Sequence, residues 1–218
     1  MSERPVRASS SSRPSGILDG PDPKRPSAGS RAWGISILLT APILSGVQTG
    51  SDAFSISRRR LDHPDGLALI ERVQAEYVER YGGPDESPID PEHFEDPEGA
   101  FFVGYLSERP VAMGGWRWHV VPPGVDATSS VEIKRMFVVP EARGRGFARQ
   151  MLAHLESTAR LAGVASIVLE TGLRQPEAIA LYESSGYLPV AGFGHYANSP
   201  LARCFAKVFS PDAAHSSP

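Results

Sequence analysis

Cysteine is almost missing from the 218-residue sequence, in which Cys204 is the only one. A single cysteine excludes an internal disulfide and is typical of a reducing compartment. The six scattered histidines and this cysteine show none of the spacings of a zinc site, so we expect no metal. A formal net charge of −3 lacks the positive excess that a nucleic-acid partner requires. Disulfide scaffolds, zinc proteins and nucleic-acid-binding proteins are therefore excluded.

A regular hydrophobic pattern is lacking in the first part of the chain. Residues 1–31 are rich in Ser, Pro, Gly and Arg and offer almost nothing to bury, which is typical of disorder. Residues 32–51 carry no charge, but Ser, Thr, Gly, Gln and Pro42 dilute their apolar centre, whereas a membrane span needs about 20 predominantly apolar residues. A signal peptide or anchor is the alternative, although the basic flank is long and no small-x-small cleavage site follows. We expect a cytoplasmic protein that does not bind membranes.

The periodicity of the remaining apolar residues predicts a single folded domain. We expect a disordered or weakly ordered extension at 1–52, the domain at 53–209 and a polar tail at 210–218. The helical segments of the domain are predicted at Asp65–Tyr81, Phe147–Gly163 and Pro176–Ser185, with one further helical turn at Pro91–Glu95. The strands are predicted at Ala53–Ser57, Ala100–Leu106, Pro110–His119, Val131–Val139, Ala165–Thr171, Tyr187–Val190 and Leu201–Phe209. The buried stripe of the first helix is predicted to consist of Leu67, Ile70, Val73, Tyr77 and Tyr81.

The stretch from Val131 to Met151 is the one around which this domain is organised. It begins as a strand that Pro140 ends, and it finishes as an amphipathic helix. Between them, the turn Arg143-Gly144-Arg145-Gly146 places two glycines and two positive charges at a helix N-terminus. Glycine lets the backbone approach a phosphate, and the first N–H groups of a helix have no intrahelical partner. The turn is therefore predicted to bind an anion, with a solvated basic turn as the alternative.

This stretch resembles motif A of the GNAT superfamily of acyl-CoA-dependent N-acetyltransferases, in which the turn reads (Arg/Gln)-x-x-Gly-x-(Gly/Ala). Arg143, Gly146 and Ala148 stand at its first, fourth and sixth positions. The resemblance covers about three quarters of the chain and is closest in pattern to small bacterial members of unassigned substrate. It implies an α/β (α+β) fold with a mixed, strongly twisted sheet of about seven strands and helices on both faces.

The resemblance also implies acetyl-CoA as co-substrate. The pantetheine arm is expected along the main chain of Met136, Phe137 and Val138. The diphosphate is expected in the turn and the first helical residues, namely Arg143, Gly144, Arg145, Gly146, Phe147, Ala148 and Arg149. Gln175 stands where relatives often carry an asparagine that binds the pantetheine, and its extra length leaves that contact open.

Acetyl transfer to an amine needs a group that takes up a proton, because alkyl amines resemble lysine, with a pKa of about 10.4, and are protonated at neutral pH. Glu132 is predicted to be this base, since relatives often carry a Glu on the same strand. Two-residue periodicity places Glu132, Lys134 and Met136 on one face. A purely structural ion pair between Glu132 and Lys134 is the alternative. The weaker candidates for the base are Glu170, His119, His195 and Tyr196.

Tyr182 is the candidate acid. It lies in Ala180-Leu-Tyr-Glu-Ser-Ser-Gly-Tyr, which resembles the family ending (Leu/Phe)-Tyr-x-x-x-Gly-(Phe/Tyr). In many relatives this tyrosine reaches the sulfur of CoA, so the resemblance implies that Tyr182 donates a proton to the departing thiolate. A tyrosine half buried against the sheet is the alternative.

These features predict an N-acetyltransferase that moves an acetyl group from acetyl-CoA to a primary amine of a small molecule, by direct attack in a ternary complex. A protein acetyltransferase acting on lysine or an N-terminus, and a non-catalytic acyl-CoA-binding module, are the alternatives. Seven carboxylates and no Lys or Arg lie between Gly83 and Gly99, which favours a cationic acceptor unless this is only a solvated acidic loop. The sequence leaves the oligomeric state open, a dimer included.

Overall fold

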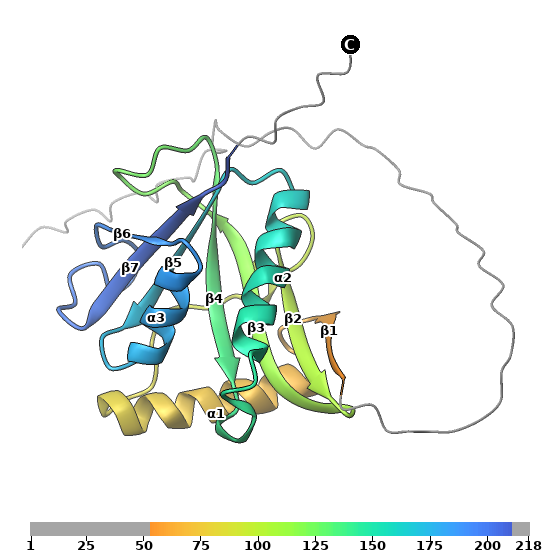
Figure 1. Cartoon of the computed structure of the whole chain (residues 1–218). Helices are drawn as coiled ribbons and strands as arrows, with labels where there is room; N and C mark the ends of the chain where they lie inside the picture. Colours follow the sequence, from red (N-terminus) through yellow and green to blue (C-terminus); the bar gives the residue numbers. More distant parts are fainter. Residues whose placement is uncertain (1–52, 211–218) are drawn as a thin grey trace, which may run out of the picture. The chain divides into compact units, whose positions relative to one another are not determined.

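The computed structural model describes residues 53–210, which fold around one seven-stranded sheet (Figure 1). The predictions for the N-terminal extension and the polar tail lie outside the described residues, apart from residue 210. The strands are β1 (Phe54–Arg59), β2 (Gly99–Leu106), β3 (Arg109–His119), β4 (Ser130–Val138), β5 (Ser166–Gly172), β6 (Leu188–Val190) and β7 (Ala202–Val208). The α-helices are α1 (Pro64–Tyr81), α2 (Phe147–Leu161) and α3 (Pro176–Ser184), and the 3₁₀ turns are η1 (Pro91–Phe94) and η2 (Pro140–Ala142).

The sheet is mixed because one of its connections is a crossover. Strands β1 to β4 form an antiparallel meander, in which Ser107 and Glu108 make the tight turn between β2 and β3. Helix α2 then returns the chain to β5, which pairs parallel with β4. Strand β7 pairs antiparallel with β5, and the short β6 forms the edge beyond it. This topology confirms the predicted mixed sheet of seven strands.

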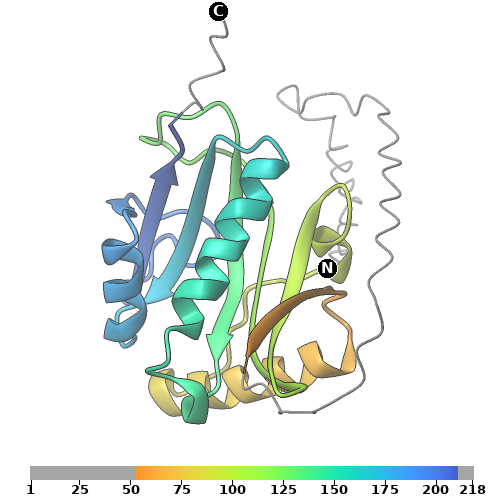
Figure 2. The same ribbon diagram turned by 45° about the vertical axis from the view of Figure 1, so that its right-hand side comes forward.

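Helices cover both faces of the sheet (Figure 2). On β2, Phe101 packs edge-on against Phe94 of η1, whereas the next residue, Phe102, packs against His154 of α2. Because successive strand residues point to opposite faces, η1 and α2 lie on opposite sides of the sheet. Helix α3 lies beside α2 (Figures 1 and 2), and α1 runs across the strands near the end of β4. No helix in residues 53–210 is long and apolar enough to span a membrane.

Helix α1 begins one residue before its predicted start, with His63 as N-cap, and ends at Gly82, whose φ of 85° only glycine adopts readily. Its buried residues are Gly66, Leu69 and Val73, whereas Leu67, predicted in the buried stripe, is half exposed. The stripe is rotated because Gly66 packs against the sheet: a Cβ there would lie 3.1 Å from the ring of Phe101. The missing side chain lets this end of α1 approach β2.

Strand β4 carries a bulge at Arg135, which has a φ of 56° and interrupts the ladder with β3 opposite Gly114. The side chain of Met136 lies next to Gly114 on the α2 side of the sheet. Glu132 and Lys134 point to the other face, where they form an ion pair. The prediction that Met136 shares a face with Glu132 and Lys134 is therefore wrong, because the extra residue of the bulge reverses the alternation.

Candidate active site

Strands β4 and β5 pair only along the first half of β4. Their ladder runs from Ser130 opposite Ser166 to Ile133 opposite Leu169. Beyond Ile133, no strand of the described chain pairs with this side of β4, although β3 continues along the other side to Val138. The main-chain groups of residues 136–138 that point to this side form an open strand edge. Such an edge can bind an extended amide-bearing chain as if it were an added strand.

The turn after β4 has the geometry of an anion cradle. Gly144 and Gly146 have φ values of 74° and 81°, and Gly146 is the N-cap of α2 with no side-chain cap. A Cβ at either glycine would meet no atom within 4 Å, so the space in front of the helix is open. The ring of Phe147 stacks on Phe54 with centroids 4.3 Å apart, which anchors the start of α2. The N–H groups of Phe147, Ala148 and Arg149 thus lie at the helix N-terminus, where an anion is stabilised.

The three arginines of this region have different environments. The Nε of Arg143 donates to the carbonyl of Val138 over 2.9 Å, and its Nη2 binds Glu76 of α1. Arg149 donates to the hydroxyls of Ser184 and Ser185 at the end of α3. Arg145 lies over the ring of Phe147 and makes no ion pair or hydrogen bond with the described residues. Arg145 is therefore the readiest of the three to bind a diphosphate, whereas Arg143 must first release Glu76 and Val138.

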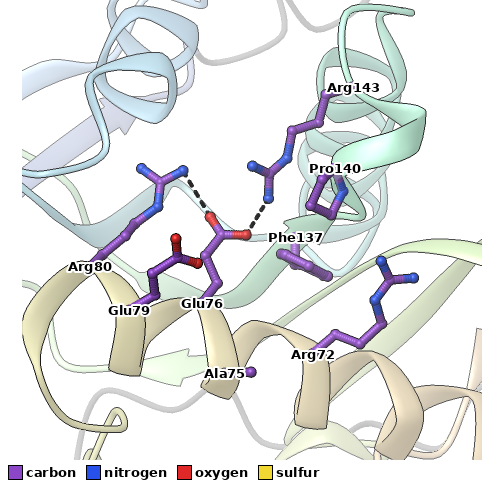
Figure 3. Close-up of a pocket in the computed structure, with 8 residues that line it drawn as sticks. All are labelled: Arg72, Ala75, Glu76, Glu79, Arg80, Phe137, Pro140 and Arg143. Atoms are coloured by element: carbon purple, nitrogen blue, oxygen red, sulfur yellow. Dashed lines mark hydrogen bonds and ion pairs between the residues drawn. The ribbon is translucent and has the colours of Figure 1, made fainter.

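A cavity of about 560 Å³ separates α1 from this turn (Figure 3). Glu76 lies at its centre and pairs with both Arg143 and Arg80, the latter over 2.8 Å. Arg80 also reaches Glu177 at the start of α3 over 2.6 Å. The lining residues are Arg72, Ala75, Glu76, Glu79, Arg80, Phe137, Pro140 and Arg143. Through these ion pairs, helix α1 connects the glycine turn at residues 143–146 with the start of α3.

Helix α3 presents the other two predicted cofactor contacts. The Oε1 atom of Gln175 accepts hydrogen bonds from the hydroxyl of Thr171 over 3.1 Å and from the N–H of Gly172 over 3.2 Å. Gln175 is therefore bound to the end of β5. Tyr182 is buried, and burial together with the nearby phenol of Tyr77 raises its pKa. The Tyr182 phenol consequently keeps its proton at neutral pH and can act as a donor.

Glu132 is tied into a network of charges. It is 2 % exposed, and its two carboxylate oxygens bind different cations. The Oε2 atom accepts from Nη2 of Arg117 over 3.0 Å and Oε1 pairs with Nζ of Lys134, also over 3.0 Å. The ion pair between Glu132 and Lys134 that the sequence suggested is therefore present, with Arg117 as a second partner. A carboxylate that holds two cations would have to break an ion pair in order to accept a proton.

Glu170 on β5 is a carboxylate outside any ion pair of the described residues. The register places it one step beyond Leu169, beside Lys134, and opposite the buried Cys204 of β7. Burial raises its pKa to about 7, and the charges of Glu132 and Asp85 act in the same direction while Lys134 opposes them. Glu170 can therefore exchange a proton near neutral pH, which suits a general base.

The remaining weak candidates have structural contacts. His119 packs edge-on against Phe193 and its Nδ1 lies 2.6 Å from the carbonyl of Val120. His195 packs against the ring of Tyr196. The hydroxyl of Tyr196 donates to Asp85 over 3.0 Å. The loop between β6 and β7 therefore contacts the segment that follows α1.

The carboxylates of the acidic stretch are largely paired with arginines. Asp96 binds Arg58 of β1 over 2.9 Å, and Glu92 and Glu95 lie within 3.8 Å of Arg60. Asp90 caps η1 through the N–H of Glu92, and Asp85 binds Arg135. Three arginines face the seven carboxylates of this stretch, so the contacts offset only part of the charge on which the prediction of a cationic acceptor depends.

Arg135 and Asp85 are not among the catalytic or cofactor-binding residues that the sequence predicts, although Asp85 belongs to the acidic stretch. Arg135 Nη1 donates to Asp85 Oδ2 over 2.9 Å, and the pair lies beside the open part of the β4–β5 gap. Neither residue belongs to the family motif, and fifty positions separate them in the chain. The one available signal was an arginine inside an otherwise alternating strand. In residues 53–210, no three His, Cys, Asp or Glu side chains come together as a metal site requires.

Comparison with known proteins identifies the family to which this fold corresponds. Residues 68–187, more than half of the chain, match the model described as the acetyltransferase (GNAT) family. The IAA acetyltransferase of Azospirillum brasilense is 45 % identical over 71 residues, covering 33 % of this chain and 46 % of that protein. N-acetyltransferase 8 of Homo sapiens is 29 % identical over 122 residues, covering 55 % of this chain and 52 % of that protein. The chain spans about half the length of the curated relatives it matches.

Solved structures agree with the family model. A Klebsiella pneumoniae protein assigned to the acyl-CoA N-acyltransferases has a TM-score of 0.57 at 26 % identity, covering 71 % of this chain and 97 % of that one. A GNAT-family acetyltransferase of Staphylococcus aureus has a TM-score of 0.55 at 17 % identity, covering 72 % and 100 %, and shows the fold alone. The matched sequence segment contains the open strand edge, the glycine turn and Tyr182. The chain therefore belongs to the acetyltransferase (GNAT) family.

Proposed function

We propose that this protein transfers an acetyl group from acetyl-CoA to a primary amine of a small molecule, by direct attack in a ternary complex. The observation that carries the proposal is the open edge of β4 leading directly into the glycine cradle at the N-terminus of α2. Membership of the family implies the use of an acyl-CoA. Acetyl as the acyl group, a small amine as acceptor and a cytoplasmic location are the parts that we add.

The residues fit a CoA thioester in two places. The main chain of residues 136–138 would hydrogen-bond the amide groups of the pantetheine arm, because that edge of β4 lacks a partner strand. The N–H groups at the start of α2, with Arg145 beside them, would bind the diphosphate. Arg143 would join them after exchanging Glu76 for a phosphate oxygen.

We assign the role of base to Glu170 in place of Glu132. Glu132 binds Arg117 and Lys134, whereas Glu170 is outside any ion pair of residues 53–210 and has a pKa of about 7. In the step we propose, the amine nitrogen forms the new bond to the acetyl carbon and its proton goes to Glu170, directly or through one water. The carbon–sulfur bond breaks, the phenol of Tyr182 gives a proton to the departing thiolate, and the phenolate regains a proton from water before the next turnover.

Two rival functions remain open to test. A protein acetyltransferase would prefer a peptide to a free amine. An acyl-CoA-binding module would hold CoA without releasing it from the thioester. The fold alone does not separate these functions, since the acceptor side differs among proteins that share it.

A thiol-release assay with acetyl-CoA tests the proposal. The panel contains small amines, peptides and, because of the name of the Azospirillum relative, IAA. We expect the enzyme to release CoA fastest with small amines as acceptors. Glu170→Gln should lower kcat/KM by a factor of about 10² or more, which is the lower end of the range expected for loss of a general base. Tight CoA binding without release on any acceptor would identify a binding module.

Glu132→Gln is the matched control, because it makes the same change on the neighbouring strand. It leaves Arg117 and Lys134 without their buried counter-ion, so we expect a lower free energy of unfolding. Per folded molecule it should keep its turnover, and the acidic limb of its pH–rate profile should move to lower pH, because the charge of Glu132 helps to raise the pKa of Glu170. If instead Glu132→Gln abolishes turnover and Glu170→Gln leaves it within about threefold of the wild type, the assignment of Glu170 is wrong.

A further inference from the structure

Arg135 combines three features that a purely structural arginine does not need. It has a φ of 56°, a left-handed conformation that costs a non-glycine residue free energy. Its side chain is only 6 % exposed although it carries a full charge. It also lies at the bulge, where β4 leaves β5 and the gap between them opens. Strained residues of this kind persist where the surrounding structure holds them for a purpose.

The guanidinium of Arg135 is only partly used. It has five N–H donors, and among residues 53–210 its one hydrogen bond is from Nη1 to Asp85. Asp85 is itself fixed in place, since it also accepts from the N–H of Ser87 and the hydroxyl of Tyr196. The main chain of Asp85 is in turn held by Gln74 of α1. Asp85 therefore orients Arg135 and leaves most of its donors for another acceptor.

The position of Arg135 relative to the proposed chemistry supports a role in binding the acceptor. The charges of Arg135 and Asp85 both reach Tyr77, whose phenol neighbours Tyr182, and Asp85 also reaches Glu170. The pair therefore lies near the groups to which we assign the proton transfers. A substrate whose amine faces Glu170 would have its adjacent atoms close to Arg135.

The balance of charge at this end of β4 favours an anion. Arg117, Lys134 and Arg135 are three cations, and the carboxylates paired with them are those of Glu132 and Asp85. Glu170 adds a further carboxylate, but it is partly protonated near neutral pH. A monoanionic group would therefore complete the network, whereas a dianion such as a phosphate would be repelled by the three carboxylates.

We propose that Arg135 binds a carboxylate of the acceptor, so that the substrate is a primary amine with a carboxylate close to it, as in an amino acid. The planar fork of a guanidinium matches a carboxylate and gives charge-assisted hydrogen bonds in a fixed geometry. This inference rests on the proposed acetyltransferase activity and names its substrate class. It replaces the cationic acceptor that the acidic stretch suggested.

The experiment compares amino acids with their decarboxylated amines and their amides in the thiol-release assay. We expect the wild type to favour the amino acids by at least tenfold in kcat/KM, equivalent to about 1.4 kcal/mol. Arg135→Gln should remove this preference while CoA affinity and turnover of the decarboxylated amines change little. Arg135→Lys keeps the positive charge but not the planar guanidinium, so it should retain part of the preference for amino acids. It replaces Arg135→Gln in the comparison if that variant does not fold.

Two controls separate substrate binding from a structural role of the Arg135–Asp85 pair. Asp85→Asn removes the counter-charge, but its amide oxygen can still accept a hydrogen bond from the guanidinium, so it should keep more of the preference for amino acids than Arg135→Gln does. Arg58→Gln removes an exposed arginine of the edge strand β1, whose partner is Asp96, and should change nothing. If Asp85→Asn and Arg135→Gln lose the preference equally, the pair is structural and the inference fails.

The wild-type panel alone can also overturn the inference. Faster turnover of decarboxylated amines or amides than of amino acids would rule out carboxylate recognition and leave the acetyltransferase intact. A loss of kcat for every acceptor in Arg135→Gln would show instead that Arg135 acts on the acetyl group. No turnover of any amine by the wild type would contradict the proposed function itself.

Discussion

The two ends of β4 are built from different kinds of groups. Around Glu132 the strand is paired on both sides, and the side chains of Glu132 and Lys134 form a buried ion pair. After the bulge at Arg135, one side of the strand is open and the following turn presents main-chain N–H groups. The first end therefore presents charged side chains that come from several elements. The second end presents main-chain groups whose positions depend on the backbone conformation.

This difference explains why one end carries a recognisable motif and the other does not. A backbone cradle needs glycine at specific φ values, and those positions lie within four consecutive residues, 143–146. An ion-pair network can be assembled from many combinations of charged residues. Arg117, Glu132 and Lys134 form one here from two strands. A relative with another acceptor can replace them without changing the cofactor end.

Helix α1 connects the two ends. Through Arg72, Glu76 and Arg80, each four residues apart, it holds Glu141, Arg143 and Glu177 around the cofactor cleft. On the same helix, Gln74 fixes the main chain of Asp85 at the acceptor end. In the proposed mode of binding, a CoA diphosphate that draws Arg143 away from Glu76 would act on the helix that also holds Asp85.

The largest effect is expected at the backbone end, from Gly146→Val. Valine at a φ of 81° is strained and adds a branched side chain in front of the helix. We expect the Kd for CoA to rise tenfold or more, about 1.4 kcal/mol, in a calorimetric titration. Gly124→Val is the matched control, because Gly124 has a φ of 84° in the β3–β4 loop. An equal loss of CoA affinity in both variants would mean that the effect is global strain and not the cradle.

A smaller effect is expected from Tyr182→Phe, which keeps the buried ring and removes only the hydroxyl. We expect kcat to fall at least fivefold with the Kd for CoA unchanged, less than for many general acids because the raised pKa makes this phenol a weak one. Stopped-flow measurement of a single turnover isolates the chemical step. A rate within about twofold of the wild type would make Tyr182 a core residue only.

The smallest effect concerns the pH dependence of stability at the side-chain end. The Glu170 pKa is about 7 in the folded protein and near its ordinary value of 4.5 in the unfolded chain. Between these values the folded state keeps a proton that the unfolded chain has lost, so the free energy of unfolding falls as pH rises and levels off above about 7. Glu170→Gln cannot ionise, so its Tm relative to the wild type should be higher at about pH 8 than at about pH 5. A difference that does not vary with pH would show that Glu170 titrates normally.

The sequence by itself determined the elements, because their signals are local. Pro64 and Gly82 bound α1, alternating apolar residues mark the strands, and the predicted turn at Pro91–Glu95 is the 3₁₀ turn η1. The glycine turn could be identified for the same reason, since a φ value depends on a single residue. The predicted strand ends differ from the observed ones by at most two residues. The individual contacts between these residues and the cofactor remain predictions.

Only the tertiary structure decided the acceptor end. The bulge at Arg135 reversed the face of Met136, Glu132 is paired with two cations, and Glu170 lies beside them with a raised pKa. Arg58 and Arg60 pair with three carboxylates of the acidic stretch, which reduces the charge that it can offer to a cationic acceptor. Each outcome depends on which charges meet across distant segments and how deeply they are buried. Electrostatic energies vary steeply with distance and burial, and neither quantity is encoded in the spacing of residues along the chain.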